Sequence, residues 1–257
     1  MTGTFAPMPG SAPLVAQVVA QTRMETRLLL RNGEQLLLAV IIPVLVLFGG
    51  VMGIEYVDLS LSHTPIDVLT PGVLALGIMS TSFTSLAIAT GFERRYGVLK
   101  RLGASPLPRH GLLLGKVGAL LVVEVLQFLV IGGVALLMDW SPELTFRGIA
   151  GALTMAVLGT AAFASLGLLV AGALRAEATL AAANLVYILL AAGGGIVLPT
   201  STYGQFADVV RLLPSGALGG GMRESFLFGT FPSGPALVLL AWAVVGTVLT
   251  ARTFKWE

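Results

Sequence analysis

A lysine that follows two glycines is the first candidate in this chain for a role in binding or catalysis. Gly111-Leu-Leu-Leu-Gly115-Lys116-Val117 is similar to a phosphate-binding loop, in which backbone N–H groups and a lysine bind nucleotide phosphates. Such a loop has four residues between its glycines and a magnesium-binding Ser or Thr after the lysine. Here three residues separate the glycines, and Val117 follows the lysine. We therefore expect that this segment does not bind a nucleotide.

Two histidines and one serine are the other candidates for catalysis. We predict that His63 and His110 lie on opposite sides of a membrane, where they cannot share a metal ion, and no His-Glu-x-x-His pattern is present. Ser105 lies in a Gly-Ala-Ser-Pro turn with no evident base except His110. The chain has no cysteine, which excludes thiol chemistry and cysteine metal sites. These observations argue against a membrane enzyme and predict that the chain itself binds no metal or cofactor.

The composition is that of an integral membrane protein. Of the 257 residues, 56% are hydrophobic and 11% are charged, whereas an average soluble domain has about 25% charged residues. A spanning helix needs about 20 apolar residues, because its backbone polar groups must be satisfied within the segment. Six segments meet this requirement: Gln35–Gly53, Leu69–Gly91, Gly111–Leu137, Gly148–Leu174, Thr179–Leu198 and Pro235–Ala251. We therefore predict an all-α integral membrane protein with six transmembrane helices.

The basic residues lie on one side of this predicted layout. If the N-terminus is cytoplasmic, all 15 Lys and Arg residues except Arg147, Arg211 and Arg223 lie on the inner side, as the positive-inside rule requires. We therefore expect a multi-pass protein of the cell membrane, a bacterial plasma membrane, with both termini in the cytoplasm. The formal net charge of +2 is too small to indicate nucleic acid as a partner.

The segment before the first span divides into two parts. Residues 1–13, rich in Pro, Gly, Ser and Thr, are expected to form a disordered cytoplasmic tail. Residues 14–34 fit an amphipathic helix in the membrane interface, and residues 35–257 would form the six-span domain. The apolar half and the adjoining basic stripe of this helix are formed by Leu14, Val15, Val18, Val19, Leu29 and Leu30, and by Arg23, Arg27 and Arg31. Met24, Glu25 and Leu28 do not fit the pattern, and a solvated helix is the alternative.

A basic segment connects the second and third spans. Its apolar and basic residues alternate at helical spacing: Phe92, Tyr96, Leu99 and Leu102 recur along one face, while Arg94, Arg95, Lys100 and Arg101 project elsewhere. Gly103, Pro106 and Pro108 predict the end of this helix, because proline disfavours helical structure at the preceding residue. The segment therefore predicts a short amphipathic helix. The alternative is a loop that only fixes the topology.

The same segment resembles the cytoplasmic loop of a known family, the ABC-2 type transporter permeases, especially their daunorubicin-resistance-like branch. The residues that carry the resemblance are Glu93-Arg94-Arg95-x-Gly97-x-Leu99-x-x-Leu102-x-x-x-Pro106, followed by Leu114-Gly115-Lys116. A second segment is similar to the outer loop of that family, with Leu212-Leu213-Pro214 followed by Gly216, Arg223, Phe226 and Gly229. The resemblance covers nearly the whole chain after the tail.

This resemblance implies the permease subunit of an ATP-driven exporter of drugs, lipids or other amphipathic substrates. In such exporters two permeases, identical or paralogous, pair in the lipid bilayer, and each recruits a separate nucleotide-binding subunit that holds ATP and Mg. The loop would form a coupling helix that docks on this ATPase through Glu93, Arg94, Arg95, Tyr96, Leu99, Lys100, Arg101 and Leu102. Short outer-leaflet helices would occupy residues 198–234, with Gly219-Gly220-Gly221 as a flexible joint.

Three residues with a carboxyl or amide side chain lie deep within the predicted spans, where burying such a group is costly. Glu124 lies in the third span with Gln127 one turn away on the same face, and Asn184 lies in the fifth. We expect these side chains to face the substrate pathway or the interface between permeases. Structural hydrogen bonds between helices are the alternative for Glu124 and Asn184.

Two other classes of function remain open. An ion- or proton-coupled secondary transporter or channel would be expected to have internal repeats and more intramembrane charges than Glu124. A membrane scaffold without transport is the other class. Binding to an ATPase, and stimulation of that ATPase by the chain, would distinguish a permease from both.

Overall fold

The computed structural model describes residues 12–31, 33–57, 63–104 and 107–254, and every regular element in these ranges is helical. Most of the predicted N-terminal tail, residues 1–11, lies outside the described residues. The α-helices are α1 (Leu14–Arg31), α2 (Gly33–Val57), α3 (Pro65–Met79), α4 (Leu86–Arg95), α5 (Val98–Leu102), α6 (Arg109–Leu137), α7 (Phe146–Ala173), α8 (Ala176–Gly193), α9 (Ala207–Leu212), α10 (Pro214–Leu227) and α11 (Ser233–Thr253). A π-helical segment (Ser80–Ser85) joins α3 to α4, and a 3-10 helix (Thr200–Phe206) precedes α9.

The helices follow the predicted order of membrane spans. Five are long and apolar enough to cross a membrane: Pro65–Arg95, His110–Leu137, Phe146–Ala173, Ala176–Gly193 and Ser233–Thr253. The first predicted span corresponds to α2, whose apolar part within the described residues is Ala39–Ile54. The fifth span differs from the prediction, because α8 ends at Gly193 and not at Leu198. Gly195 has a φ of +69°, a left-handed conformation in which a regular α-helix cannot continue.

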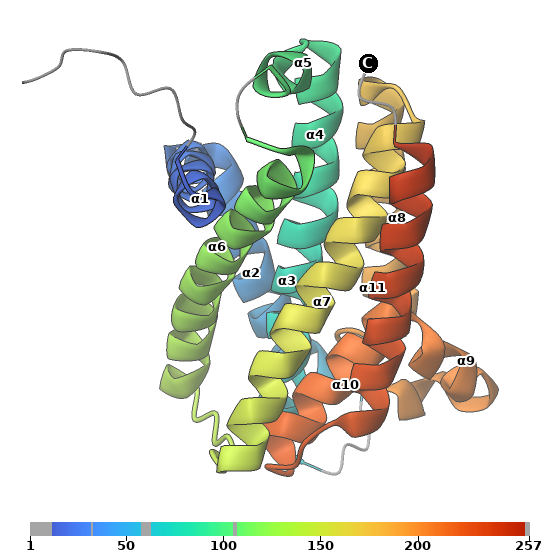
Figure 1. Ribbon diagram of the computed structural model, residues 1–257. Helices are drawn as coiled ribbons and strands as arrows, with labels where there is room; N and C mark the ends of the chain where they lie inside the picture. The colour runs from blue at the N-terminus through green and yellow to red at the C-terminus, as the bar shows by residue number, and fades with distance from the viewer. Residues whose placement is uncertain (1–11, 32, 58–62, 105–106, 255–257) are drawn as a thin grey trace, which may run out of the picture.

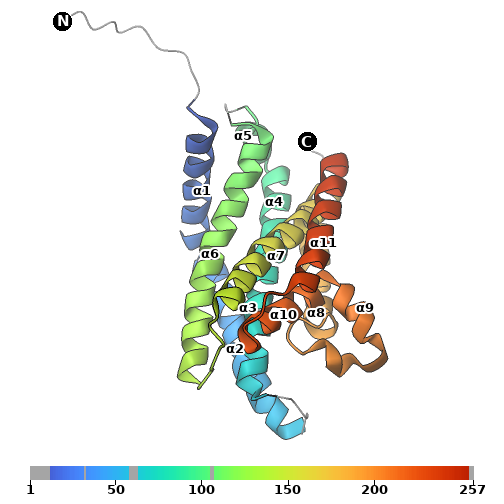
Figure 2. The same ribbon diagram turned by 60° about the horizontal axis from the view of Figure 1, so that its bottom comes forward.

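The second span occupies the centre of the bundle. Residues 66–79 of α3 are buried, and α2, α6, α7 and α10 pack around them (Figures 1 and 2). After Met79 the helix widens into the π-helical segment, which the sequence reasoning did not predict. The run Ser-Thr-Ser-Phe-Thr-Ser offers hydroxyl groups that compete for backbone carbonyls, and Ser82 Oγ donates to the Ile78 carbonyl. A π-helical turn inside a span often marks a functional position.

The short outer helix α10 corrects one expectation from the sequence. We predicted a flexible joint at Gly219-Gly220-Gly221, but α10 continues through these residues without a break. A Cβ at Gly219 would lie 2.5 Å from the Ile196 carbonyl oxygen, and one at Gly221 would lie 2.7 Å from Met155 Sδ. The prediction was wrong because Gly219 and Gly221 allow α10 to approach its neighbours closely, which offsets the low helix propensity of glycine.

The N-terminal helix lies at the end of the bundle where α5 and the last turn of α11 also lie. Figure 1 shows α1 almost end-on while α4 and α11 run along the page, and Figure 2 shows its length beside α6. Hence α1 crosses the direction of α4 and α11, as expected for a helix in the membrane interface. Arg23, Arg27 and Arg31 are exposed along it, as are Val15 and Val19.

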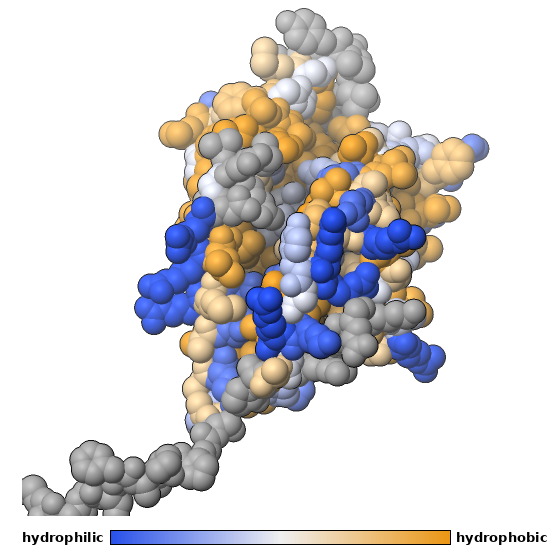
Figure 3. Space-filling view, turned by 90° about the horizontal axis from the view of Figure 1, so that it is seen from above, coloured by the Kyte–Doolittle hydropathy of each residue, from blue (hydrophilic) through white to orange (hydrophobic). Residues whose placement is uncertain are grey.

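The two ends of the bundle differ in charge as the sequence predicts. Figure 3 looks onto the end that carries α1 and α5, where hydrophilic side chains gather between apolar flanks. Among the described residues, the basic side chains of the opposite end are Arg147, Arg211 and Arg223. This asymmetry gives the bundle one basic face, which we call the α1–α5 end.

Candidate functional site

The chain turns sharply at the α1–α5 end, between the second and third spans. Helix α4 ends at Arg95, and Gly97 has a φ of +68°, the left-handed conformation that glycine adopts at low cost. Helix α5 then occupies only Val98–Leu102 and is followed by Gly103, as the turn signals predict. The predicted single amphipathic helix from Phe92 to Leu102 is therefore two helices, because the conformation of Gly97 interrupts the helical spacing.

This bend divides the predicted docking residues into an exposed set and a buried set. Tyr96 has 65% of its surface exposed, and Lys100 and Arg101 are also exposed on α5. Leu99 is only 2% exposed and packs inside the chain, while Leu102 is half-buried. The surface open to a partner is therefore aromatic and basic, and Leu99 supports it from inside.

Two arginines at the end of α4 fix this bend to the neighbouring spans. The Arg94 guanidinium donates to the carbonyls of Gly172 and Leu174 at the C-terminal end of α7. These carbonyls have no partner within their helix, and a cation is favourable at a helix C-terminus. Arg95 forms an ion pair with Glu177 in the first turn of α8. A movement of the bend would therefore be passed on to α7 and α8.

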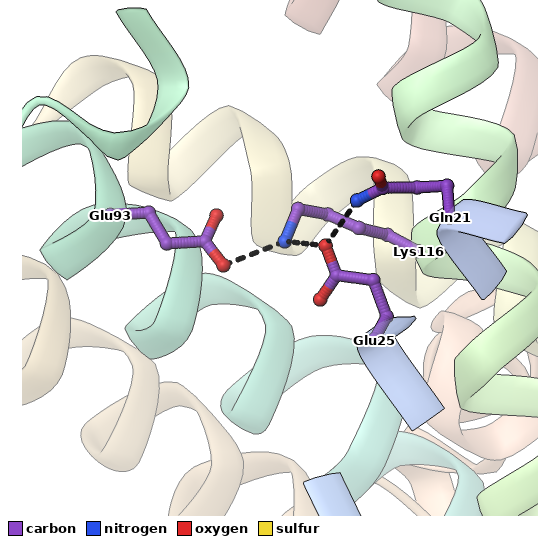
Figure 4. Close-up of polar contacts among 4 residues, drawn as sticks. All are labelled: Gln21, Glu25, Glu93 and Lys116. Atoms are coloured by element: carbon purple, nitrogen blue, oxygen red, sulfur yellow. Dashed lines mark hydrogen bonds and ion pairs between the residues drawn. The ribbon is translucent and has the colours of Figure 1, made fainter. Parts of the chain in front are cut away.

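A buried ion-pair cluster joins α1, α4 and α6. Lys116 Nζ lies 2.7 Å from Glu93 Oε1 and 3.0 Å from Glu25 Oε1, and Gln21 Nε2 donates to the same Glu25 oxygen at 2.8 Å (Figure 4). Lys116 is 5% exposed, so the lysine of the loop-like motif is enclosed by carboxylates and does not fit a nucleotide phosphate. Glu25 was not predicted from the sequence as a site residue. The available signal was that this acidic residue does not fit the amphipathic pattern of its helix.

Glycines in α6 bring α1 close enough for this cluster to form. A Cβ at Gly115 would lie 2.8 Å from Gln21 Cβ, and one at Gly118 would lie 2.8 Å from Thr22 Oγ1. Such approaches are closer than a Cβ allows, so the two helices can pack this way only with glycine at both positions. The sequence between Gly115 and Gly118 therefore places Lys116 directly against α1.

Glu124 and Gln127 lie deep in the bundle and bond to other helices of the same chain. The Thr160 hydroxyl donates to Glu124 Oε2 at 2.6 Å. Gln127 Nε2 donates to the Ala39 carbonyl at 2.8 Å, and Gln127 Oε1 accepts from Thr81 Oγ1 at 3.0 Å. Glu124 and Gln127 are 3% and 1% exposed, so neither side chain reaches the surface of the chain. Their part in a substrate pathway stays a prediction.

Asn184 has a different environment, on the outward face of α8. It is exposed, and Leu185 and Ile188 beside it are 59% and 61% exposed. An amide on an apolar helix face within a membrane needs a partner outside the helix, because lipid chains offer it none. This arrangement fits the predicted interface with a second permease.

A buried arginine organises the opposite end of the bundle. Arg223 of α10 donates to the carbonyls of Val68, Gly195, Ile196 and Val197, which follow α8 or belong to α3. Burial lowers the pKa of Arg223 to about 10, so the guanidinium stays protonated at neutral pH. The resemblance identified Arg223 as a motif residue, and the structure shows that it ties three segments together.

Comparison with protein families gives a match over most of the chain. A family model described as ABC-2 type transporter matches residues 16–227, from α1 to the end of α10. No curated protein matches the chain. The matched range includes the α4–α5 bend and the Glu25–Lys116–Glu93 cluster.

Within the part of the chain that the structure describes, no three His, Cys, Asp or Glu residues gather to form a metal site.

Proposed function

This chain belongs to the ABC-2 type transporter family, and we propose on that basis that it is the permease subunit of an ATP-driven exporter. Membership makes it the membrane component of an ABC transporter and not the subunit that hydrolyses ATP. A separate nucleotide-binding subunit, with ATP and Mg bound to it, would drive export of a drug, lipid or other amphipathic substrate. A second permease, identical or paralogous, would complete the transporter.

The observation that carries this proposal is the exposed surface of the α4–α5 bend. Tyr96, Lys100 and Arg101 are exposed there, while Arg94 and Arg95 fix the bend to α7 and α8. A short helix of this kind can dock in a groove on a partner, where the aromatic side chain anchors it and the basic residues orient it. Closure of the ATPase would then move the bend, and the spans attached to it would follow.

The outward face of α8 supports the second part of the proposal. Asn184 lies there among exposed apolar residues, in a span that packs less extensively in the bundle than the second span. A second copy or a paralogue could cover this face and satisfy the amide across the interface. Alternating opening of the space between two permeases would then move the substrate.

The test is ATP hydrolysis by a nucleotide-binding subunit that is expressed together with the chain and reconstituted in vesicles. The chain should stimulate hydrolysis, and Tyr96→Ala with Arg101→Glu should reduce complex formation, since loss of an anchor costs about 2 kcal/mol, roughly thirtyfold in affinity. Arg211→Glu, at an exposed arginine of the opposite end, is the matched control. Full assembly and stimulation by the Tyr96 and Arg101 variant would refute this docking surface.

A further inference from the structure

A cavity opens between α6, α7 and α11 at the α1–α5 end, and nothing described so far uses it. Its volume is about 480 Å3, which is within the range of small-molecule sites. We call it the α6–α7–α11 groove, and it is lined by His110, Leu113, Leu114, Val117, Ala161, Ala164, Ser165, Leu168, Thr247, Thr250, Ala251 and Phe254. Figure 1 shows α7 running between α6 and α11.

The interior of the groove is mainly apolar, although hydroxyl groups contribute to its lining. Ser165 Oγ donates to the Ala162 carbonyl, and Thr250 Oγ1 donates to the Ser165 carbonyl, both at 2.8 Å. These hydroxyls therefore have their hydrogen-bond donors in use inside the protein. Apart from Thr247 and the imidazole of His110, the surface left for a ligand is formed by aliphatic side chains and the ring of Phe254.

Two side chains that can bind an anion lie at the mouth of the groove or next to a residue that lines it. His110 lines it and is exposed, and Arg252, which follows the lining residue Ala251, is also exposed. Within the described residues, neither side chain has a hydrogen-bond or ion-pair partner. An imidazole N–H and a guanidinium can both donate to phosphate oxygens, and the guanidinium is always charged.

The groove is polar at the end that faces the membrane interface and apolar at the end that lies deeper in the membrane. His110 and Phe254 lie at helix ends, whereas Val117 and Thr247 lie deeper, and seven residues of helix span about 10 Å. Leu114 on the wall of the groove is 54% exposed, so the groove opens sideways to hydrocarbon. A ligand that fits has an anionic head at the interface and an apolar chain about 10 Å into the leaflet.

We propose that the α6–α7–α11 groove is a binding site for an anionic phospholipid from the surrounding leaflet. One acyl chain lies against Leu113, Val117 and Leu168, and the phosphate lies between His110 and Arg252. A lipid fits better than a second permease copy, because the exposed amide Asn184 that calls for a protein partner lies on α8, which does not line the groove. The proposal rests on membrane location and not on coupling to an ATPase.

Native mass spectrometry of the full chain in detergent tests the proposal. The added lipids are dioleoylphosphatidylglycerol, which is anionic, and dioleoylphosphatidylcholine, which has no net charge, in equal amounts, so that the acyl chains are the same and only the headgroup differs. The wild type should retain at least fivefold more dioleoylphosphatidylglycerol than dioleoylphosphatidylcholine, because each basic residue near an anionic headgroup raises the affinity about fivefold. The His110→Ala/Arg252→Ala variant should lose this preference, whereas Arg211→Ala at the opposite end should keep it.

Two variants test the acyl-chain part of the groove from opposite walls. Ala161→Phe on α7 and Thr247→Phe on α11 should each lower retention of both lipids several-fold by filling the groove. Leu153→Phe, on α7 outside the groove, is the matched control and should leave retention unchanged.

Several results would overturn the proposal. Equal retention of the two lipids by the wild type would do so, as would a preference that survives in the His110 and Arg252 variant. Retention that is unchanged in both Phe variants would show that the lipid binds elsewhere. If the wild type is a dimer and the same two Phe variants make it a monomer, the groove is an interface between copies and not a lipid site.

Discussion

The buried Lys116 gives the sharpest prediction, because removing its charge leaves two carboxylates without a counter-ion. Glu25 and Glu93 contact the ammonium at 3.0 and 2.7 Å, and their side chains are 10% and 23% exposed. Breaking a buried ion pair by removing one partner costs about 3–5 kcal/mol. In a chain of this size, Lys116→Met should therefore lower the Tm by roughly 6–20 °C.

The measurement is thermal unfolding of the purified chain in detergent, compared with a charge-balanced variant. Glu25→Gln/Glu93→Gln/Lys116→Met removes all three charges and should recover most of the lost stability, since no buried charge remains unpaired. Arg95→Met is the matched control at an exposed ion pair, whose partners are 49% and 63% exposed. Exposed pairs contribute at most about 1 kcal/mol, so its Tm should change by about 4 °C or less.

The local consequence is the release of α1. Since Lys116 ties Glu25 of α1 to Glu93 of α4, amide hydrogen exchange in α1 should speed up in Lys116→Met before the spans unfold. The stabilising role of Lys116 is refuted if Lys116→Met unfolds at the same temperature as Arg95→Met. It is also refuted if the charge-balanced variant is no more stable than Lys116→Met.

Three further predictions concern the rest of the bundle. Arg223→Met should destabilise the chain by roughly 1–3 kcal/mol for each carbonyl that loses its donor and is not reached by water, measured as a lower Tm; an unchanged Tm would contradict this. Ser141→Cys should react with a membrane-impermeant thiol reagent in intact cells, while Lys100→Cys should react only after permeabilisation; the reverse pattern would invert the topology. Glu124→Gln should match or exceed the wild-type Tm, because the amide keeps the shape of the side chain and its oxygen can still accept from the Thr160 hydroxyl; a large drop in Tm would show that the carboxyl group is needed.

The spans and their order could be predicted from the sequence because the bilayer imposes a length and an apolar composition on each of them. The predicted third span, Gly111–Leu137, lies within α6 and shares its end at Leu137. The basic residues likewise predicted which ends of the helices lie together. Local conformation was harder to predict, because a glycine can either end a helix or allow a helix to pack closely against its neighbour. Gly97 interrupts a helix, whereas Gly219 lies inside one and allows a close contact.

The site could be predicted only in part, because the packing of neighbouring helices decides which side chains are buried and which are exposed to a partner. Leu99 and Tyr96 have similar positions in the helical pattern, but Leu99 is buried by the fold and Tyr96 is exposed. Lys116 was visible in a motif, but its ion pair with Glu25 joins residues far apart in the sequence. No periodicity in either segment predicts such a pairing.

Cysteine cross-linking between the α4–α5 bend and a nucleotide-binding subunit tests whether this bend is the coupling surface. The chain has no native cysteine, so an introduced thiol reacts without background. We predict that Lys100→Cys, which keeps the Tyr96 anchor, cross-links to a single cysteine introduced on the co-expressed ATPase, and that Phe206→Cys, exposed at the opposite end, does not. Cross-linking from Phe206→Cys, or its absence from Lys100→Cys in an assembled and active transporter, would contradict the proposed coupling surface.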